Sequence, residues 1–407
     1  MIVGAVASVV CVGAIRKSQR TRALRLCAEK QAAECERACA MGMPPGCTLL
    51  GHMYQQGAQG VAKDETKAVS LYEKSCSAGY QLACVELGFM YKGGLGGLDR
   101  DERKAVSLYS RACELHEEAG CASLGIAYGN GTGGLTKDHV RAAQLLGESC
   151  DAGDQKGCAY LAWYYEHGAG GLAKDQAKAV ALAQQACDHR DSRGCDTLGV
   201  YLQHGSGIPK DLAKAVALFG QVCDDGDATG CVRLGLMYHY GNDAIAKDET
   251  RAVKFYKLAC RMNDARGCAY LGSMYAVGAG GLETDEVQAA ALFRQGCDGG
   301  NAWGCEKLGV MYGKGAGGLA QDQARAESLY KQSCDAGEAD GCLNLAIGYE
   351  NGKGGLPSNY EMAADLFGRA CDGGQRVGCD RLHRLCQGAK DGLIKTPTRC
   401  LNPGTGQ

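Results

Sequence analysis

The residues with the widest chemical potential in this chain are its cysteines, of which the sequence holds 25. Ten pairs have seven residues between their members, and successive pairs start 37 residues apart, with a single step of 36. The pairs are Cys39 with Cys47, Cys76 with Cys84, Cys113 with Cys121, Cys150 with Cys158, Cys187 with Cys195, Cys223 with Cys231, Cys260 with Cys268, Cys297 with Cys305, Cys334 with Cys342 and Cys371 with Cys379. Cysteine thiols form disulfides, bind metal ions or act as nucleophiles. Zinc sites usually place about two to four residues between neighbouring ligands and often include histidine. The eight histidines do not accompany the pairs, so we expect disulfides and no metal or cofactor site.

Five cysteines lie outside this pattern: Cys11, Cys27, Cys35, Cys386 and Cys400. Cys386 and Cys400 can form a bridge that holds the C-terminal tail. Cys27 and Cys35 are also eight residues apart, but the segment 28–34 contains no turn residue. A continuous helix would hold them about 12 Å apart, so we expect no bond between them. Because the total is odd, at least one cysteine is unpaired or joins another chain.

The fixed period indicates a repeat architecture, in which short units stack on one another. Counted from the second cysteine of a pair, leucine follows after three residues in all ten pairs. Glycine or alanine follows after four residues in nine of them, and usually tyrosine after seven. Cys84, Leu87, Gly88 and Tyr91 are one example. These offsets lie on one face of a helix. Glycine costs about 1 kcal/mol relative to alanine inside a helix, so its recurrence predicts a neighbouring helix that packs too close for a side chain.

A second helix is expected after a glycine-rich loop. It begins at an aspartate or asparagine, residue types that cap helix N-termini. These residues are Asp64, Asp101, Asp138, Asp175, Asp211, Asp248, Asp285, Asp322 and Asn359. A basic residue and alanine follow, and the helix ends at the first cysteine of the next pair. A turn then separates the paired cysteines, so that two antiparallel helices bring their Cα atoms within the 4.4–6.8 Å that a disulfide needs.

The pattern therefore predicts an all-α solenoid of α/α hairpins cross-linked by disulfides. We expect four regions along the chain. Residues 1–21 form an apolar signal or anchor followed by a basic stretch, and residues 22–46 form an N-terminal capping half repeat. Residues 47–378 hold nine repeats, and residues 379–407 form a C-terminal cap helix and tail.

The composition and the N-terminus bear on location and partners. Residues 1–15 are apolar or small, but fifteen helical residues span only about 22 Å of a hydrocarbon core of about 30 Å. We expect a signal or a membrane tether there. Regularly spaced cysteines are typical of oxidising compartments, so the expected location is extracytoplasmic: periplasmic, secreted or tethered. A net charge of −2 gives no indication of nucleic-acid binding.

The repeat resembles the Sel-1-like repeat family, relatives of tetratricopeptide repeats. The match is carried by Gly157-Cys-Ala-Tyr-Leu-Ala162 with Tyr165, and by Lys178-Ala179 after the loop. The spaced pair of Cys187 and Cys195 is similar to the cysteine-rich, secreted, Hcp-type branch, whose members are often called β-lactamase-like. The resemblance extends from Cys39 to Cys379; the extra Gly-Gly step in the loops departs from that branch.

The resemblance implies a scaffold that binds a protein or peptide and has no chemistry of its own. We expect the binding surface on the concave face of the first helices, with Arg233, Lys307 and Asn344 as candidates at a variable position. An alternative implied by the branch is penicillin binding or weak β-lactam hydrolysis. Ser328 and Lys331 fit the Ser-x-x-Lys pattern of serine β-lactamases, but the companion Ser-Asp-Asn and Lys-Thr-Gly motifs are absent. A third possibility is a structural spacer of the cell envelope.

Overall fold

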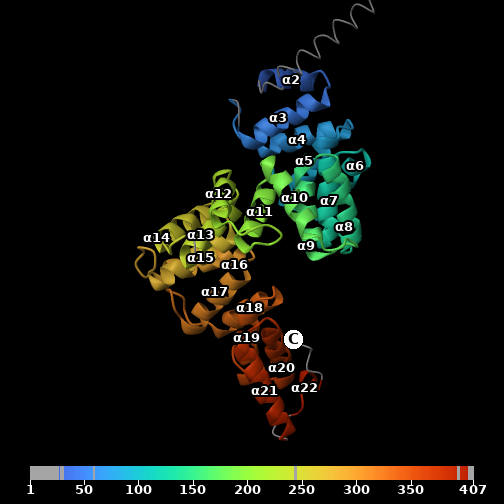
Figure 1. Cartoon of the computed structure of the whole chain (residues 1–407). Helices are drawn as coiled ribbons and strands as arrows, with labels where there is room; N and C mark the ends of the chain where they lie inside the picture. Colours follow the sequence, from blue (N-terminus) through green and yellow to red (C-terminus); the bar gives the residue numbers. More distant parts are fainter. Residues whose placement is uncertain (1–26, 28–31, 58–59, 243–244, 392–394, 402–407) are drawn as a thin grey trace, which may run out of the picture. The chain divides into compact units, whose positions relative to one another are not determined.

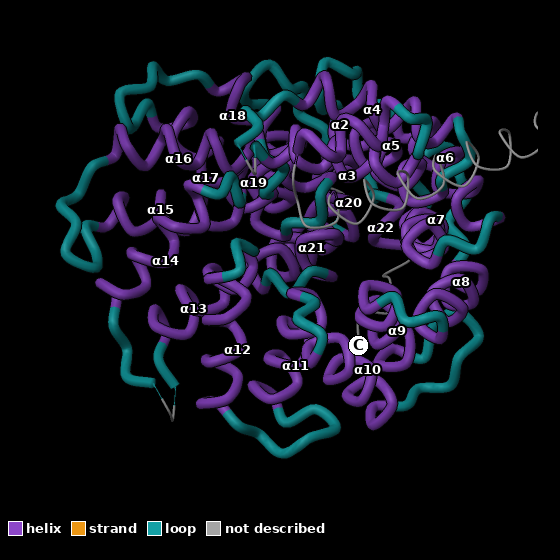
Figure 2. The backbone as a smooth tube through the Cα atoms, turned by 90° about the horizontal axis from the view of Figure 1, so that it is seen from above, coloured by secondary structure: helices purple, strands orange, loops and turns teal. Residues whose placement is uncertain are grey.

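The computed structural model describes residues 27, 32–57, 60–242, 245–391 and 395–401 (Figure 1). Over that part of the chain the regular elements are helices joined by turns and loops, with no strand (Figure 2). The all-α prediction is therefore confirmed. Among the described helices, none is long and apolar enough to cross a membrane. The expected tether at residues 1–15 and Cys11 lie outside the described residues.

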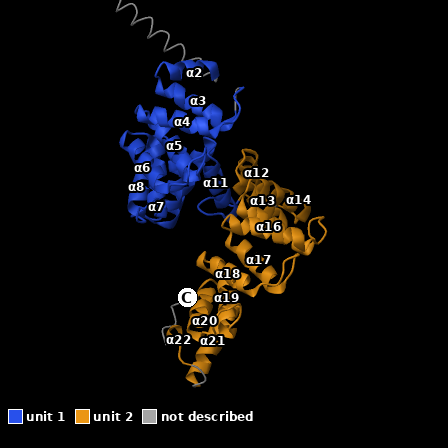
Figure 3. Cartoon of the chain, turned by 180° about the vertical axis from the view of Figure 1, so that it is seen from behind, with its two compact units in different colours: residues 1–210 blue, residues 211–407 orange. Residues whose placement is uncertain are grey.

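The chain divides into two compact units, which we describe separately (Figure 3). Unit 1 comprises residues 1–210. Its helices are α2 (Ala32–Ala40), α3 (Pro44–Gln56), α4 (Glu65–Ser77), α5 (Gln81–Gly93), α6 (Glu102–Glu114), α7 (Glu118–Asn130), α8 (His139–Asp151), α9 (Gln155–His167), α10 (Gln176–Asp188) and α11 (Ser192–His204).

Unit 2 comprises residues 211–407 and continues the same alternation. Its helices are α12 (Leu212–Asp224), α13 (Ala228–Tyr240), α14 (Glu249–Arg261), α15 (Ala265–Val277), α16 (Glu286–Asp298), α17 (Ala302–Lys314), α18 (Gln323–Asp335), α19 (Ala339–Asn351), α20 (Tyr360–Asp372), α21 (Arg376–Lys390) and the short α22 (Thr398–Leu401).

The loop inside each hairpin is closed by local chemistry that the sequence predicts. In the second full hairpin, α5 is capped at its C-terminus by Gly94, whose φ of 62° is the left-handed conformation that glycine adopts without strain. The carboxylate of Asp101 then accepts a hydrogen bond of 2.9 Å from the Lys104 amide and caps α6. The Lys104 amine lies 4.2 Å from the centroid of the Tyr91 ring. The basic residue after the cap thus covers the tyrosine of the preceding helix.

Disulfides join successive hairpins at the turns. All ten pairs that the spacing predicts are bonded, with Cα–Cα distances between 4.4 and 4.8 Å. The bonds in unit 1 join Cys39 to Cys47, Cys76 to Cys84, Cys113 to Cys121, Cys150 to Cys158 and Cys187 to Cys195. Those in unit 2 join Cys223 to Cys231, Cys260 to Cys268, Cys297 to Cys305, Cys334 to Cys342 and Cys371 to Cys379.

The two cysteines of each bond come from neighbouring helices. The first member lies in the last turn of one helix, as Cys113 does in α6, and the second lies in the first turns of the next, as Cys121 does in α7. Each nine-residue loop closed in this way contributes roughly 2.6 kcal/mol in the chain-entropy estimate. The Cys386–Cys400 bridge is also present, with a Cα–Cα distance of 5.4 Å, and connects α21 to α22.

The expectation for Cys27 and Cys35 is wrong. These residues are bonded, with their Cα atoms 4.6 Å apart. The expectation assumed one continuous helix through both cysteines, but α2 begins only at Ala32. The eight-residue spacing therefore predicts a disulfide here as in the other ten pairs, although residues 28–34 contain no glycine.

The core contains the predicted cysteine, leucine and glycine or alanine positions of the first helices and an aromatic or aliphatic position on the second. The prediction is wrong for most of the recurring tyrosines, which are half-buried, because the position one residue earlier, as at Met90, is the one that faces the core. A Cβ atom added to Gly88 would lie 2.5 Å from Cε1 of Tyr109, and one added to Gly51 would lie 2.6 Å from Cε1 of Tyr72. The close approach predicted from these glycines is confirmed, and the neighbour is the ring of a buried tyrosine.

Candidate ligand-binding face

Each hairpin has a first helix, which we call the A helix, and a second, the B helix. The A helices are α3, α5, α7, α9, α11, α13, α15, α17, α19 and α21, and the B helices are the even-numbered helices from α4 to α20. The position two residues after the second cysteine and the position five residues after it are mostly half-buried or exposed. We call these two positions of all A helices the A face. They vary in residue type from repeat to repeat, whereas the core positions recur.

The structure brings two of the three candidate residues to one place. Lys307 on α17 and Asn344 on α19 are half-buried, and both contact Glu306. Arg233, on α13, is also half-buried but lies two repeats earlier, with its guanidinium 5.9 Å from the Phe219 ring centroid. The shared partner of Lys307 and Asn344 is a residue that the sequence analysis did not select.

Glu306 is an almost completely buried carboxylate, with 3% of its surface exposed. Its Oε1 accepts a hydrogen bond of 3.0 Å from Asn344 Nδ2. Its Oε2 forms an ion pair with Lys307 Nζ at 2.8 Å. Burying a carboxylate costs several kcal/mol, which an ion pair offsets only when the remaining lone pairs are also satisfied. Each oxygen of Glu306 therefore has a partner, one a cation and one an amide.

A cavity of about 500 Å³ opens beside this carboxylate, between α17, α18 and α19. We call it the Glu306 cavity. Its polar lining comprises Glu306, Lys314, Gln323, Tyr330, Asp340 and Asn344. Burial raises the pKa of the Tyr330 hydroxyl, and the charges of Glu306 and Glu327 raise it further. Two carboxylates therefore lie close enough to the Tyr330 hydroxyl to disfavour its ionisation.

Glu327 on α18 is the second of these carboxylates and is 4% exposed. Gln323 Nε2 donates a 2.9 Å hydrogen bond to Oε1, and no described group donates to Oε2. Burial raises the pKa of Glu327, opposed by the Gln323 hydrogen bond and by the charge of Lys353. A Cβ on Gly348 would overlap the Glu327 carboxylate, so this glycine provides the space that the acid occupies.

The A face of unit 1 has a different character. His52 on α3 lies 3.8 Å from Glu86 on α5, measured from Nε2 to Oε1. Burial raises the pKa of Glu86, opposed by the charges of His52 and of Lys156. Although the Lys156 side chain is exposed overall, protein atoms around its amine displace enough water to lower its pKa. Phe89 and Trp163, which occupy the same A-face position two repeats apart, are 52% and 42% exposed.

Comparison with known proteins identifies the repeat. The family model described as "Sel1 repeat" matches nine stretches: residues 44–80, 81–116, 119–154, 155–191, 195–227, 228–264, 265–301, 304–338 and 339–375. The chain belongs to the Sel1 repeat family.

Two solved structures show what this Sel1 repeat protein is similar to. A Sel1 repeat protein from Oxalobacter formigenes is 27% identical, with a TM-score of 0.51, over 62% of this chain and 99% of its own. A protective antigen from uropathogenic Escherichia coli strains, described as displaying an SLR fold, is 26% identical with a TM-score of 0.49. That match covers 87% of this chain and 74% of the antigen. No curated protein matches the chain.

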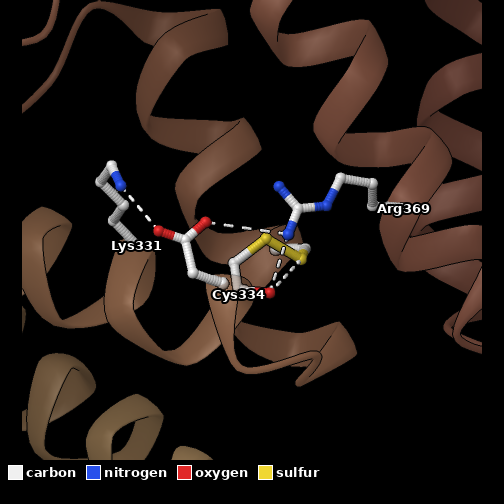
Figure 4. A network of polar contacts seen from close by, with 5 residues as sticks. Lys331, Cys334 and Arg369 are labelled. Carbon is white, nitrogen blue, oxygen red and sulfur yellow. Dashed lines mark hydrogen bonds and ion pairs between the residues drawn. A yellow bond between two sulfur atoms is a disulfide. The ribbon is translucent and has the colours of Figure 1, made fainter. Parts of the chain in front are cut away.

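The lysine of the Ser-x-x-Lys pattern in this Sel1 repeat protein forms an ion pair with an acid of its own helix. Ser328 is exposed on α18. The amine of Lys331 lies 2.6 Å from Asp335 Oδ2, and Asp335 also pairs with Arg369 of α20 at 3.8 Å (Figure 4). Arg369 in turn donates a 2.8 Å hydrogen bond to the carbonyl oxygen of Cys334 (Figure 4). Lys331 thus belongs to a network that joins two B helices. Within the described residues there is no group of three or more His, Cys, Asp or Glu side chains that could hold a metal ion.

Of the residues that the sequence analysis missed, Glu327 and Gly348 each interrupt a repeat position, whereas Glu306 shares its position with the acids Asp196 and Asp380. At the Glu327 position the other complete repeats of this Sel1 protein have only valine or alanine: Val69, Val106, Ala143, Val180, Val216, Val253, Ala290 and Ala364. At the Gly348 position the other repeats carry methionine, tyrosine, leucine or alanine. A search for exceptions within the aligned repeats, in place of the recurring residues, would have found both.

Proposed function

We propose that this Sel1 repeat protein is a scaffold that binds a protein or peptide segment on its A face and catalyses no reaction. The observation that carries the proposal is the difference between the core positions and the A-face positions of the repeat. Core positions recur nearly unchanged, while A-face positions vary and include half-buried charged and exposed aromatic side chains. Known repeat solenoids present such extended, variable surfaces to their ligands.

We further propose that the protein works in an oxidising, extracytoplasmic compartment and belongs to the cysteine-rich, Hcp-type branch. Twelve disulfides in the described structure support the compartment, because reducing cytosol keeps most thiols reduced. The regular eight-residue cysteine separation supports the branch.

Site-specific photo-crosslinking tests the binding surface. A photoreactive amino acid would replace Val310 on the A face of α17 or, as the matched control, Val287, which is 63% exposed on the B helix α16. Both variants would be expressed with their natural export route and irradiated in cells. We expect discrete protein adducts from position 310 and none from position 287. Equal labelling at both positions, or none at either, would contradict A-face binding and favour a structural spacer.

A further inference from the structure

The space beside a B helix differs among three repeats of unit 2: it is a cavity in one, is bridged by ion pairs in the second and is filled by a chain segment in the third. The cavity, of about 450 Å³, lies between α14 and α16, and ligand pockets typically span about 300–1,000 Å³. We call it the α14–α16 groove. Leu271 and Tyr275 of α15 form its floor, and its walls include Lys257 and Arg261 of α14 and Gln295 of α16.

Between α18 and α20 the same repeat positions carry an ion-pair network. Lys331 and Asp335, four residues apart on α18, pair with each other, and Asp335 also pairs with Arg369 of α20 (Figure 4). The residues at these positions in the α14–α16 groove are Lys257, Arg261 and Gln295. Opposite charges four residues apart stabilise a helix, whereas like charges destabilise it. Helix stability therefore does not account for the two cations of α14.

Arg261 is the exception at its position, directly after the first cysteine of a pair. The other B helices carry serine, glutamate or aspartate there: Ser77, Glu114, Asp151, Asp188, Asp224, Asp298, Asp335 and Asp372. Arg261 is exposed and Lys257 is half-buried, and within the described part of the chain neither forms an ion pair. No aspartate or glutamate is among the described residues that line the groove. The Lys257 amine lies 5.9 Å from the centroid of the Tyr275 ring, so both cations are available above an aromatic floor.

The C-terminal segment of the chain fills the corresponding space beside α20. Its short helix α22 lies against α20 (Figure 1). The Arg399 guanidinium pairs with Asp372 of α20, and Cys400 is bonded to Cys386 of α21. Arg399 also lies where a side chain on Gly368 would extend. This space therefore accommodates one turn of helix with a charged side chain.

The residues that hold α22 have counterparts in the α14–α16 groove. The equivalent residues are Arg261 and Asp372, Lys257 and Gly368, and Tyr275 and Cys386. The α14–α16 groove thus has two cations at the positions where the space beside α20 has a carboxylate and a glycine. A segment bound there in the manner of α22 needs an acidic side chain at the position of Arg399, because a carboxylate is the complement of a guanidinium.

We infer that the α14–α16 groove binds an acidic peptide segment of a partner protein, whose aspartate or glutamate side chain accepts hydrogen bonds from Lys257 and Arg261. A guanidinium donates two parallel hydrogen bonds to a carboxylate, and a lysine amine provides further donors. The residues that line this groove are not A-face positions. The inference therefore adds a second binding surface, independent of the A face.

Subtractive peptide selection tests this site. Phage that display random 12-residue peptides would be selected on the oxidised full chain and then depleted on Arg261→Asp. This variant introduces the residue type found at that position in six other B helices, and it places an aspartate four residues after Lys257, as in the pair of Lys331 and Asp335. We therefore expect it to fold, which circular dichroism would verify. Peptides that bind the A face are removed in the depletion, because the A face is unchanged.

The surviving peptides would be synthesised, and their affinity would be measured for wild type, Arg261→Asp, Lys257→Gln and Arg376→Asp. The last variant is the matched control, since Arg376 is exposed on α21 and does not line the groove. We expect every survivor to contain an acidic residue. Replacing it by the corresponding amide should weaken binding at least tenfold, and Arg261→Asp should do the same. Lys257→Gln should have a smaller effect, and Arg376→Asp should have none.

Three results would overturn the inference. The first is that no peptide survives the depletion, and the second is that survivors bind equally well after their acids are neutralised. The third is an equal loss of affinity in Arg376→Asp, which would indicate attraction to the net charge of the protein in place of a defined site. Each result leaves the A-face scaffold standing, because the crosslinking from Val310 tests that surface separately.

Discussion

Units 1 and 2 are made from the same repeat but present different A faces. Both use the same disulfide at every turn and the same glycine-against-ring contact in the core. Unit 1 exposes Phe89 and Trp163 and pairs His52 with Glu86, whereas unit 2 holds the buried carboxylate of Glu306 beside a cavity. The residues that stabilise the repeat are therefore different from the residues that distinguish the A face of unit 1 from that of unit 2.

The largest expected effect tests whether the turns of the two units are equivalent. Replacing Cys150 and Cys158 of unit 1 by alanine should lower the free energy of unfolding by roughly 2.6 kcal/mol, the loop-closure estimate for nine residues. The same change at Cys297 and Cys305 of unit 2 should have a similar effect. Urea unfolding followed by circular dichroism measures both. A loss of unfolding free energy in one unit and none in the other would show that the disulfides of the two units are not equivalent.

The next effect concerns the helix contacts. Gly88→Ala in unit 1 and Gly235→Ala in unit 2 would press a methyl group against the rings of Tyr109 and Tyr256. We expect each change to destabilise the protein by about 1–3 kcal/mol, the usual cost of overpacking. The same urea unfolding measures both variants.

Two other glycines serve as controls for that measurement. Gly147 in α8 and Gly220 in α12 have no atom within 4 Å of an added Cβ. Alanine at either position should instead stabilise the protein by about 0.4–1 kcal/mol, because the unfolded chain loses freedom and the helix gains propensity. A stabilising effect of alanine at Gly88 or Gly235 would show that the rings can move away.

A smaller effect concerns stability as a function of pH, for which a carboxylate in unit 2 and one in unit 1 should have opposite signs. Burial raises the pKa of Glu327 above its ordinary value of 4.5, so ionisation of this group destabilises the folded state. Glu327→Gln should match wild type at pH 4 and become more stable as the pH rises through the raised pKa. At pH 7 we expect Tm to increase by about 2–4 °C, the shift given by about 1 kcal/mol in a domain of this size.

Glu102 of unit 1 provides the opposite sign. A hydrogen bond from Arg100 lowers the pKa of this half-buried carboxylate, so its ionised form stabilises the folded state above the ordinary pKa. Glu102→Gln should therefore lower Tm slightly at pH 7, and the difference should vanish at low pH. Thermal scans at several pH values measure both variants, and equal pH profiles would refute the assigned environments.

The last prediction is that replacing Ser328 has no effect on β-lactam hydrolysis. Ser70 and Ser107 of unit 1 occupy the same B-helix position as Ser328 of unit 2, but only Ser328 has a lysine three residues later. Lys331 pairs with Asp335, so we expect no nitrocefin turnover above buffer for the oxidised protein and no change in Ser328→Ala. Turnover that depends on Ser328 would instead support the β-lactam alternative.

The sequence was sufficient to predict the hairpin, because the features that make it are local and recur in nine repeats. The caps at Asp101 and its equivalents, the cysteine bonds and the close approach at Gly88 all follow from residue type and spacing. Cys27 and Cys35 were misjudged because the turn argument required a glycine or similar residue, while the spacing alone carried the information.

The Glu306 cavity was not predictable in the same way. It depends on side chains from α17, α18 and α19, which come together only when hairpins stack. The sequence shows that Glu327 and Gly348 are exceptions, but not that one fills the space left by the other. Lys307 and Asn344 were selected by their position on the A helix, and the structure adds the carboxylate that both contact.

The disulfides hold successive hairpins together in both units. A free-thiol count on the native protein, purified without reductant and denatured before labelling, tests this directly. Twelve disulfides among 25 cysteines predict no more than one free thiol per chain. A count near 25 would contradict both the cross-linked solenoid and the proposed oxidising compartment.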